Sequence, residues 1–201
     1  MKHFETELPE NYRKVYEIDA KDKKTALLLN GAGLVLFVLA LLPFALTVGL
    51  LSTVRGFGSG KLFLFYGVFI ASLLAYFVLH ELVHGAVYKL LTHQKLTFGV
   101  SWSCAYCGVP NVYVYRLASI LAILAPFVVF TAVLLPPAIA LTGLPLVRLI
   151  CILLFAIHVS GCIGDLYGAG LMLFRFRDPK LLVRDTGPKQ TYYLPEIEEA
   201  L

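Results

Sequence analysis

Apolar residues dominate four long segments of the chain, and polar residues gather before, between and after them. The segments span residues 26–54, 62–91, 117–141 and 146–174. Each is long enough to cross a hydrocarbon core about 30 Å thick, which needs about 20 helical residues. The pattern therefore predicts four transmembrane helices. Because Pro126, Pro136 and Pro137 interrupt the third segment, we expect that helix to kink and to end early.

Between the second and third segments, the pattern changes to that of a β-strand. From Leu96 to Tyr106 an apolar residue occupies every second position, which is the period of a half-buried strand. A turn is expected at 108–111 and a short return strand at 112–115. We therefore predict a β-hairpin beside the second helix. It would be either a packing flap or an exposed edge that receives an extended substrate by strand addition.

The composition indicates a membrane protein and excludes a soluble domain. Hydrophobic residues make up 59% of the 201 residues, and charged residues make up 15%. The net charge of +4 does not indicate a nucleic-acid partner, because the basic residues flank the apolar segments, where they set orientation. We expect an all-α polytopic membrane protein with four transmembrane helices and a short β-hairpin between helices 2 and 3.

Three regions are expected along the chain, namely an N-terminal segment (1–25), a four-helix membrane domain (26–174) and a C-terminal tail (175–201). The first apolar run is longer than a signal-peptide core and follows about two dozen mostly polar residues, so it is expected to be a retained anchor. With four spans, 14 of the 17 Lys and Arg residues lie on one side of the membrane. Both termini are therefore predicted on the cytoplasmic side of the cell membrane.

The second apolar segment contains the sequence HELVHG, in which His80, Glu81 and His84 form an HExxH motif. Residues four apart lie on one face of a helix, so both imidazoles can reach one metal ion. Glu81 lies beside them as a candidate base for water at the metal. The motif alone is weak, because it arises by chance in soluble helices. Its membrane setting strengthens it, since ionisable groups are costly in hydrocarbon.

Glu81 and Asp165 are the only acidic residues between Asp22 and Asp178. Catalytic zinc sites usually have three protein ligands and water, so Asp165 is the candidate third ligand beside the two histidines. Helical rise places His80 and Asp165 at similar depth, about 27 and 24 Å from the outer ends of their helices. We therefore predict a Zn²⁺ site near the cytoplasmic edge of the membrane core.

Two other residues of the fourth segment leave alternatives open. His158 and Cys162 lie on the same helix face as Asp165, so either could bind the metal instead. A continuous helix would place His158 about 10 Å farther along the axis than Asp165. That distance favours a role for His158 behind the ligands or in stabilising the transition state. A histidine hydrogen-bonded within the bundle is the equally weighted alternative.

Several other residues carry weaker signals. Cys104 and Cys107 form a C-x-x-C on the predicted cytoplasmic side, where a structural disulfide is not expected and the second half of a zinc finger is missing. Asp185 begins a D-T-G triplet, but a second catalytic Asp in matching context is missing, so an aspartic protease is set aside. His93 is expected at the surface. Gly85 would leave room beside the metal for a substrate backbone.

These motifs resemble those of a known group of enzymes. HELVHG in one membrane helix and an Asp in a later parallel helix are similar to the three-helix core of the site-2 protease type of intramembrane metalloprotease. The resemblance is closer to a family of zincin peptidases, which are small bacterial membrane proteins with about four spans. It covers helices 2 to 4 and includes LAPF at 124–127 and GDLY at 164–167.

The resemblance implies a zinc metalloendopeptidase. The implied zinc ligands are His80, His84 and Asp165, and Glu81 is the implied base. The substrate would be a membrane protein or membrane-associated peptide, cleaved near the cytoplasmic face. The alternative is a zinc-binding membrane scaffold or metal-handling protein without protease activity.

The chain also departs from the site-2 protease pattern. His158 lies near the position of an Asn in those enzymes, and Leu166 follows the Asp where they have a Gly. A PDZ domain is missing as well. Substrate gating must therefore come from the hairpin, the termini or a partner.

Overall fold

The computed structural model describes residues 2–101 and 105–196, and it divides into two compact units. The first unit consists of Met1–Leu28, Glu81–Ala125 and Gly164–Leu201. The second consists of Leu29–His80 and Pro126–Ile163. Three long helices are each divided between the two units, so a unit boundary lies within each of these helices.

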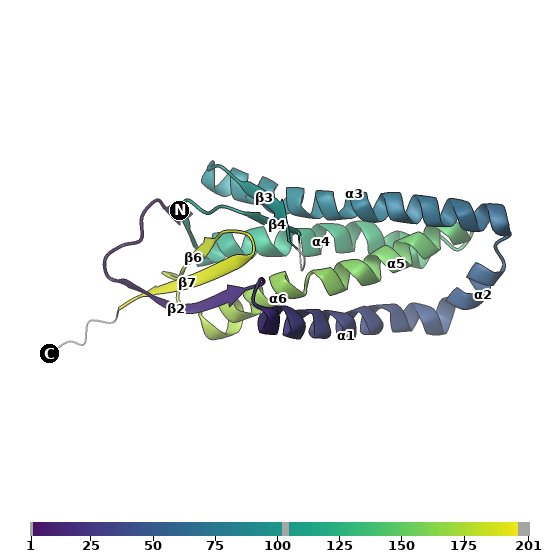
Figure 1. The fold of residues 1–201 in the computed structure, drawn as a ribbon, viewed down its shortest axis with the longest axis horizontal. Helices are drawn as coiled ribbons and strands as arrows, with labels where there is room; N and C mark the ends of the chain where they lie inside the picture. The colour runs from purple at the N-terminus through teal and green to yellow at the C-terminus, as the bar shows by residue number, and fades with distance from the viewer. Residues whose placement is uncertain (1, 102–104, 197–201) are drawn as a thin grey trace. The chain divides into compact units, whose positions relative to one another are not determined.

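Helices make up most of the described chain (Figure 1). They are α1 (Lys23–Val48), α2 (Leu50–Arg55), α3 (Ser59–Thr92), α4 (Arg116–Ala140), α5 (Pro145–Gly161), α6 (Ile163–Gly170) and a π-helical turn, η1 (Leu171–Arg175). Among the described residues, α1, α3 and α4 are each long and apolar enough to cross a membrane. The segments Pro145–Gly161 and Ile163–Arg175 pass the same test together, although they are bent by 42°, and would make a fourth span if counted as one.

The second unit is a bundle of apolar helices that approach one another closely. Gly33 of α1 faces Ser160 of α5, where an added Cβ would lie 3.1 Å from the serine carbonyl oxygen. A glycine at this position therefore lets the two helices meet, as small residues do in membrane bundles. Phe44 and Phe155 make an edge-to-face contact between the same helices, with ring centroids 6.2 Å apart.

Helix α4 continues through all three of its prolines to Ala140, so the prediction that it ends early is wrong. The end of the helix lies beside Arg148 of α5, whose Nε donates to the carbonyl oxygen of Ala138 at 3.0 Å. Its Nη2 donates to the carbonyl oxygen of Ile139 at 3.3 Å. Carbonyls of a last turn lack partners within the helix. The guanidinium of Arg148 therefore supplies hydrogen-bond partners for two carbonyls at the end of α4.

The fourth predicted helix is broken at Cys162. Helix α5 ends at Gly161, and the Cys162 amide donates to the carbonyl oxygens of His158 and Ser160. A new helix, α6, begins at Ile163. A short tightened turn of this kind changes the direction of a span without leaving its amides unpaired.

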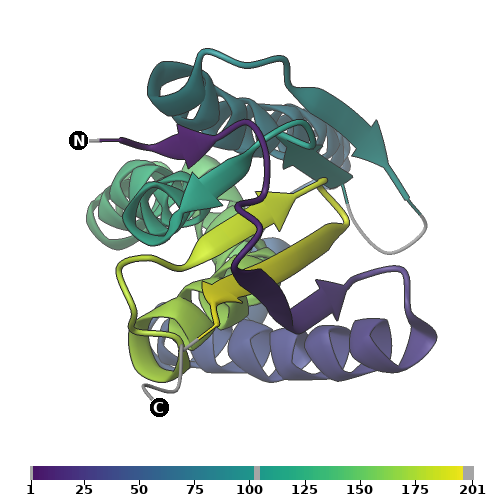
Figure 2. The ribbon, with the colours of Figure 1, turned by 90° about the vertical axis from the view of Figure 1, so that its left-hand side faces the viewer.

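The first unit contains a five-stranded antiparallel sheet with the strand order β1-β5-β6-β7-β2 (Figure 2). Its strands are β1 (Phe4–Glu5), β2 (Tyr12–Asp19), β5 (Tyr113–Tyr115), β6 (Leu182–Asp185) and β7 (Lys189–Pro195). Residues from the sheet and from α4, α6 and η1 form one apolar core, which includes Ile123, Met172 and Tyr192. The all-α prediction is therefore wrong for both ends of the chain, although the fold is mainly helical.

A separate hairpin follows α3, but its register differs from the prediction. Strand β3 (Thr97–Val100) pairs with β4 (Ala105–Gly108), with Thr97 opposite Gly108 and Val100 opposite Ala105. The single strand expected over 96–106 is therefore folded back on itself, and its residues 102–104 lie outside the described part of the chain. Alternation has the same period in both arms of a hairpin, so it did not reveal the turn. Strand β5, expected as the return strand, belongs to the larger sheet.

Candidate metal centre

Helix α3 runs without interruption from Ser59 to Thr92 and carries the whole HExxH motif. His80 and His84 are both buried, with 8% and 6% of their surface exposed. They are separated by one turn of a continuous helix, which places them on one face. Glu81 is partly exposed and follows His80 directly. The helix thus provides two buried imidazoles and an accessible carboxylate, as the motif requires.

His84 is held by contacts on both of its ring nitrogens. Its Nδ1 lies 2.9 Å from the carbonyl oxygen of Ala122 in α4. A carbonyl oxygen only accepts hydrogen bonds, so this contact requires the proton of His84 on Nδ1. The lone pair of Nε2 then points away from Ala122. Metal-binding histidines in proteins are commonly oriented by this kind of bond.

The Nε2 atom of His84 lies 3.4 Å from Oδ2 of Asp165 in α6. When His84 is neutral with its proton on Nδ1, both of these atoms carry lone pairs, and a cation between them would be stabilised by each. Zinc bonds to nitrogen and oxygen of about 2.0–2.2 Å at a tetrahedral angle separate the two ligand atoms by about 3.4 Å. The first unit therefore presents a nitrogen and an oxygen at the spacing that zinc requires.

His80 belongs to the second unit, where a chain of hydrogen bonds fixes its orientation. The Nε2 of His158 lies 3.2 Å from the carbonyl oxygen of Phe127, so this nitrogen carries the proton. Nδ1 of His158 must then accept, and of its two neighbouring donors the Tyr76 hydroxyl at 3.1 Å is nearer than the Cys162 thiol at 3.5 Å. The Tyr76 oxygen in turn accepts from Nδ1 of His80 at 3.1 Å. With its proton on Nδ1, His80 carries its lone pair on Nε2.

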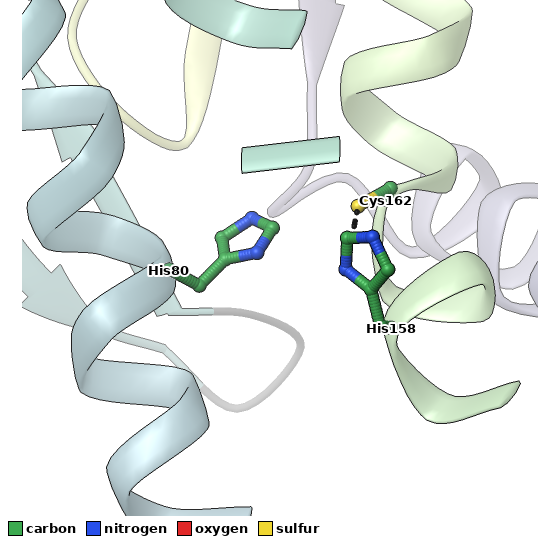
Figure 3. Close-up of side chains that lie close together, drawn as sticks. All are labelled: His80, His158 and Cys162. Carbon is green, nitrogen blue, oxygen red and sulfur yellow. Dashed lines mark hydrogen bonds between the residues drawn. The ribbon is translucent and has the colours of Figure 1, made fainter. Parts of the chain in front are cut away.

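Because the helix is broken at Cys162, the separation of about 10 Å between His158 and Asp165 that a continuous helix would give does not apply. His158 is fully buried and contacts the hydroxyl of Tyr76, which also contacts His80. Figure 3 shows the imidazoles of His80 and His158 facing each other from two helices. These contacts agree both with a role of His158 behind the ligands and with a histidine that is only hydrogen-bonded within the bundle, so its role stays a prediction. The joint set of His80, His84 and Asp165 draws on both units and stays a prediction, as does the role of Glu81 as base.

The space expected beside Gly85 is filled by the hairpin. An added Cβ on Gly85 would lie 2.8 Å from Cζ of Phe98 and 3.1 Å from Cδ1 of Leu96. The missing side chain therefore admits β3 and not a substrate backbone. In this respect the sequence interpretation is wrong.

The structure also adds residues that sequence reasoning missed. Tyr76 is one of them, since it lies one turn before His80 and bridges two histidines. Tyr88, one turn after His84, donates from its hydroxyl to Oδ2 of the buried Asp185 at 2.7 Å. The D-T-G triplet thus has a structural use. The sequence could have indicated both tyrosines, because one lies four residues before His80 and the other four residues after His84 on the same helix.

Cys107 lies in β4 and is buried. Burial, with the negative charges of Glu81 and Asp185, raises the pKa of its thiol to about 12. A thiol with this pKa stays protonated at neutral pH and makes a poor nucleophile. Its C-x-x-C partner, Cys104, lies outside the described residues.

With this geometry in place, comparison with known families decides the classification. A family model described as "Putative zincin peptidase" matches residues 73–178, which is more than half of the chain. The chain belongs to this zincin peptidase family. The matched stretch includes the HExxH motif, the hairpin, α4 and Asp165. Family membership implies zinc as the metal and points to a metallopeptidase. No curated protein and no solved structure shows a significant match to this chain.

Proposed function

We propose that this zincin peptidase is a membrane-embedded zinc metalloendopeptidase. The observation that carries the proposal is the pairing of His84 with Asp165 at 3.4 Å, with the other imidazole nitrogen of His84 held by the Ala122 carbonyl. His80, His84 and Asp165 would hold the zinc. Two imidazoles and a carboxylate are a donor set found at catalytic zinc sites.

Bound zinc would polarise a water molecule and the scissile carbonyl group. Glu81, which follows the first ligand and is partly exposed, would take a proton from that water and pass it to the leaving amine. The chain Phe127–His158–Tyr76–His80 would keep the proton of His80 on Nδ1 and hold the ring in one orientation. Ala122 would do the same for His84. These contacts fix the ligands before substrate binds.

The membrane setting suggests the class of substrate. Up to four apolar spans in the described chain fit a polytopic protein of the cell membrane. The excess of basic residues in the N-terminal segment, the second loop and the tail favours a cytoplasmic position for both termini. A transmembrane or membrane-associated peptide cleaved near the cytoplasmic face is the substrate that this arrangement would receive. This arrangement would be analogous to that of site-2 proteases.

The hairpin would present the substrate in an extended form. In the described chain, β3 is paired on one side with β4, and Phe98 and Val100 of β3 are 48% and 83% exposed. An intact helix shields its carbonyl groups, so a transmembrane substrate must unwind before cleavage. Addition of the unwound segment to the outer edge of β3 would satisfy its backbone amides.

The experiment that tests this function compares membrane-protein fragments in cells that produce the wild type or Glu81→Gln. Glu10→Gln is a matched control, since Glu10 is exposed in the N-terminal segment. We expect fragments that appear with the wild type and the control and are absent with Glu81→Gln. Identical fragments in all three would contradict a peptidase. That result would favour a zinc-binding scaffold or a metal-handling protein.

A further inference from the structure

Three residues of the second unit form a cluster of metal-binding groups that includes sulfur. His80, His158 and Cys162 are all buried, and one potential ligand atom from each lies within 4.8 Å of the others. They come from two places in the fold, namely α3 and the end of α5 (Figure 3). Buried clusters of this composition suit ions that prefer nitrogen and sulfur.

The break in the helix gives Cys162 its position. The residue follows the last turn of α5, and its amide is bonded to the carbonyl oxygen of His158. Its Sγ lies 3.5 Å from Nδ1 of His158. Thiol and imidazole are therefore already within reach of a common ion.

His158 has the hydrogen-bond pattern of a ligand. Its Nε2 donates to the Phe127 carbonyl at 3.2 Å and lies 3.3 Å from the Thr131 hydroxyl. Both contacts are on the side of the ring away from Cys162. The lone pair of Nδ1 faces the thiol and the Tyr76 hydroxyl. A bound ion would replace the hydrogen bond from Tyr76, while the Phe127 carbonyl would keep the ring in place.

We propose that His80, His158 and Cys162 form a second metal position, suited to Zn²⁺, Cd²⁺ or Cu⁺. Binding there exchanges the Cys162 thiol proton for the ion, and the proton leaves to water. The inference deepens the proposed function, because His80 is also a predicted ligand of the catalytic zinc. Both positions need His80, so one ion bound through this imidazole occupies one position at a time. An ion bound by Cys162 and His158 lacks the Asp165 carboxylate as a ligand and is therefore not in the catalytic position.

X-ray absorption of the purified full-length protein loaded with cadmium tests this proposal, because the spectrum distinguishes sulfur from nitrogen and oxygen ligands. We expect one sulfur ligand in the wild type and its loss in Cys162→Ser. Cys151→Ser is the matched control, since Cys151 lies in α5, outside the cluster. It should keep the sulfur ligand. Asp165→Asn should also keep it, because that substitution changes only the first position.

A second variant guards against a failure of Cys162→Ser to fold. In the Asp165→Asn background, where the first position lacks its carboxylate, His158→Gln removes a different ligand and should weaken cadmium binding by at least about tenfold relative to Cys151→Ser in that background. No sulfur ligand in the wild type, or one that survives in Cys162→Ser, would overturn the proposal. Its loss in Asp165→Asn would also overturn it, because the two positions would not be separate. None of these outcomes bears on cleavage by the zinc-loaded wild type, so the proposed peptidase function is tested independently.

Discussion

The Nε2 atom of His84 lies 3.4 Å from Oδ2 of Asp165, although the two residues come from different helices. The Ala122 carbonyl determines that this nitrogen, and not Nδ1, faces the carboxylate. A backbone carbonyl in α4 therefore orients the histidine of α3 toward the carboxylate of α6. The same principle applies to His80, where Tyr76 holds Nδ1. Much of the predicted site is thus set by residues outside the motif.

Asp165→Ala should remove zinc from the catalytic position. We expect about one zinc per chain in Cys162→Ser, where the second position lacks its sulfur, and a strong loss in Cys162→Ser/Asp165→Ala. Elemental analysis of the purified proteins measures both. Asp178→Ala in the same background is the control, since Asp178 is an acid outside the site. Full zinc occupancy in the double variant would show that Asp165 is not a ligand.

Tyr76→Phe should weaken zinc binding with little change of shape. The substitution removes the hydroxyl that contacts both His80 and His158, so the His80 ring loses its fixed orientation. In the Cys162→Ser background we expect zinc affinity to fall by about 10–100-fold, measured by competition with a chelator. Tyr66→Phe is the matched control, because Tyr66 lies on the same helix and is exposed. Equal affinities in the two variants would exclude an orienting role for Tyr76.

The buried carboxylate of Asp185 predicts a pH dependence of stability. Burial raises its pKa to about 6, although hydrogen bonds from Tyr88 and the Gly187 amide oppose the shift. The folded state therefore binds this proton more tightly than the unfolded chain does. The binding of this proton by Asp185 stabilises the folded state in full below about pH 4, and this stabilisation is lost as the pH rises through about 6.

The size of this effect is on the order of 3 kcal/mol. Thermal unfolding in detergent between about pH 4 and 7 measures it as the difference between wild type and Asp185→Asn. The variant should lose less stability than the wild type as the pH rises. Asp178→Asn should follow the wild type. Parallel curves for wild type and Asp185→Asn would rule out Asp185 as the group responsible.

The predicted orientation places the start of α3 on the outer side of the membrane. A cysteine introduced at Ser59, in a chain whose own cysteines are replaced, should react with an impermeant reagent added outside the cell. A cysteine at Lys180, in the tail, should react only after the membrane is opened. Labelling of the Ser59 position from the cytoplasm alone would reverse the topology.

The apolar helices could be predicted from the sequence because length and composition alone require them. Helix α3 extends from Ser59 to Thr92, close to the predicted 62–91. Gly161 and Gly164 allow the fourth predicted helix to unwind locally, but glycine is common in membrane helices and does not place a break by itself. The five-stranded sheet was also missed. Its longest pairing joins β2 to β7 from opposite ends of the chain. Local sequence patterns do not indicate which distant strands pair.

The candidate site shows the same division between local and distant information. His80 and His84 follow from one helical turn of spacing, and Asp165 was found because acids are rare in this chain. Ala122 gave no signal, because it acts through its backbone carbonyl. Asp185 was set aside with its triplet, yet its contact with Tyr88 places it in the same unit as His84. Such roles depend on tertiary contacts that only the fold reveals.

The most direct test of the account compares cleavage by the wild type and Glu81→Gln at equal zinc content. Both purified proteins would be reconstituted in lipid vesicles together with a substrate. The substrate would be a membrane protein that is cleaved in cells producing the wild type and not in cells producing Glu81→Gln. Gln keeps the size of Glu81 and removes its basic carboxylate. Cleavage should therefore fall by at least about a hundredfold while zinc stays bound. Equal cleavage by zinc-loaded Glu81→Gln would contradict the role of Glu81 and the peptidase mechanism built on it.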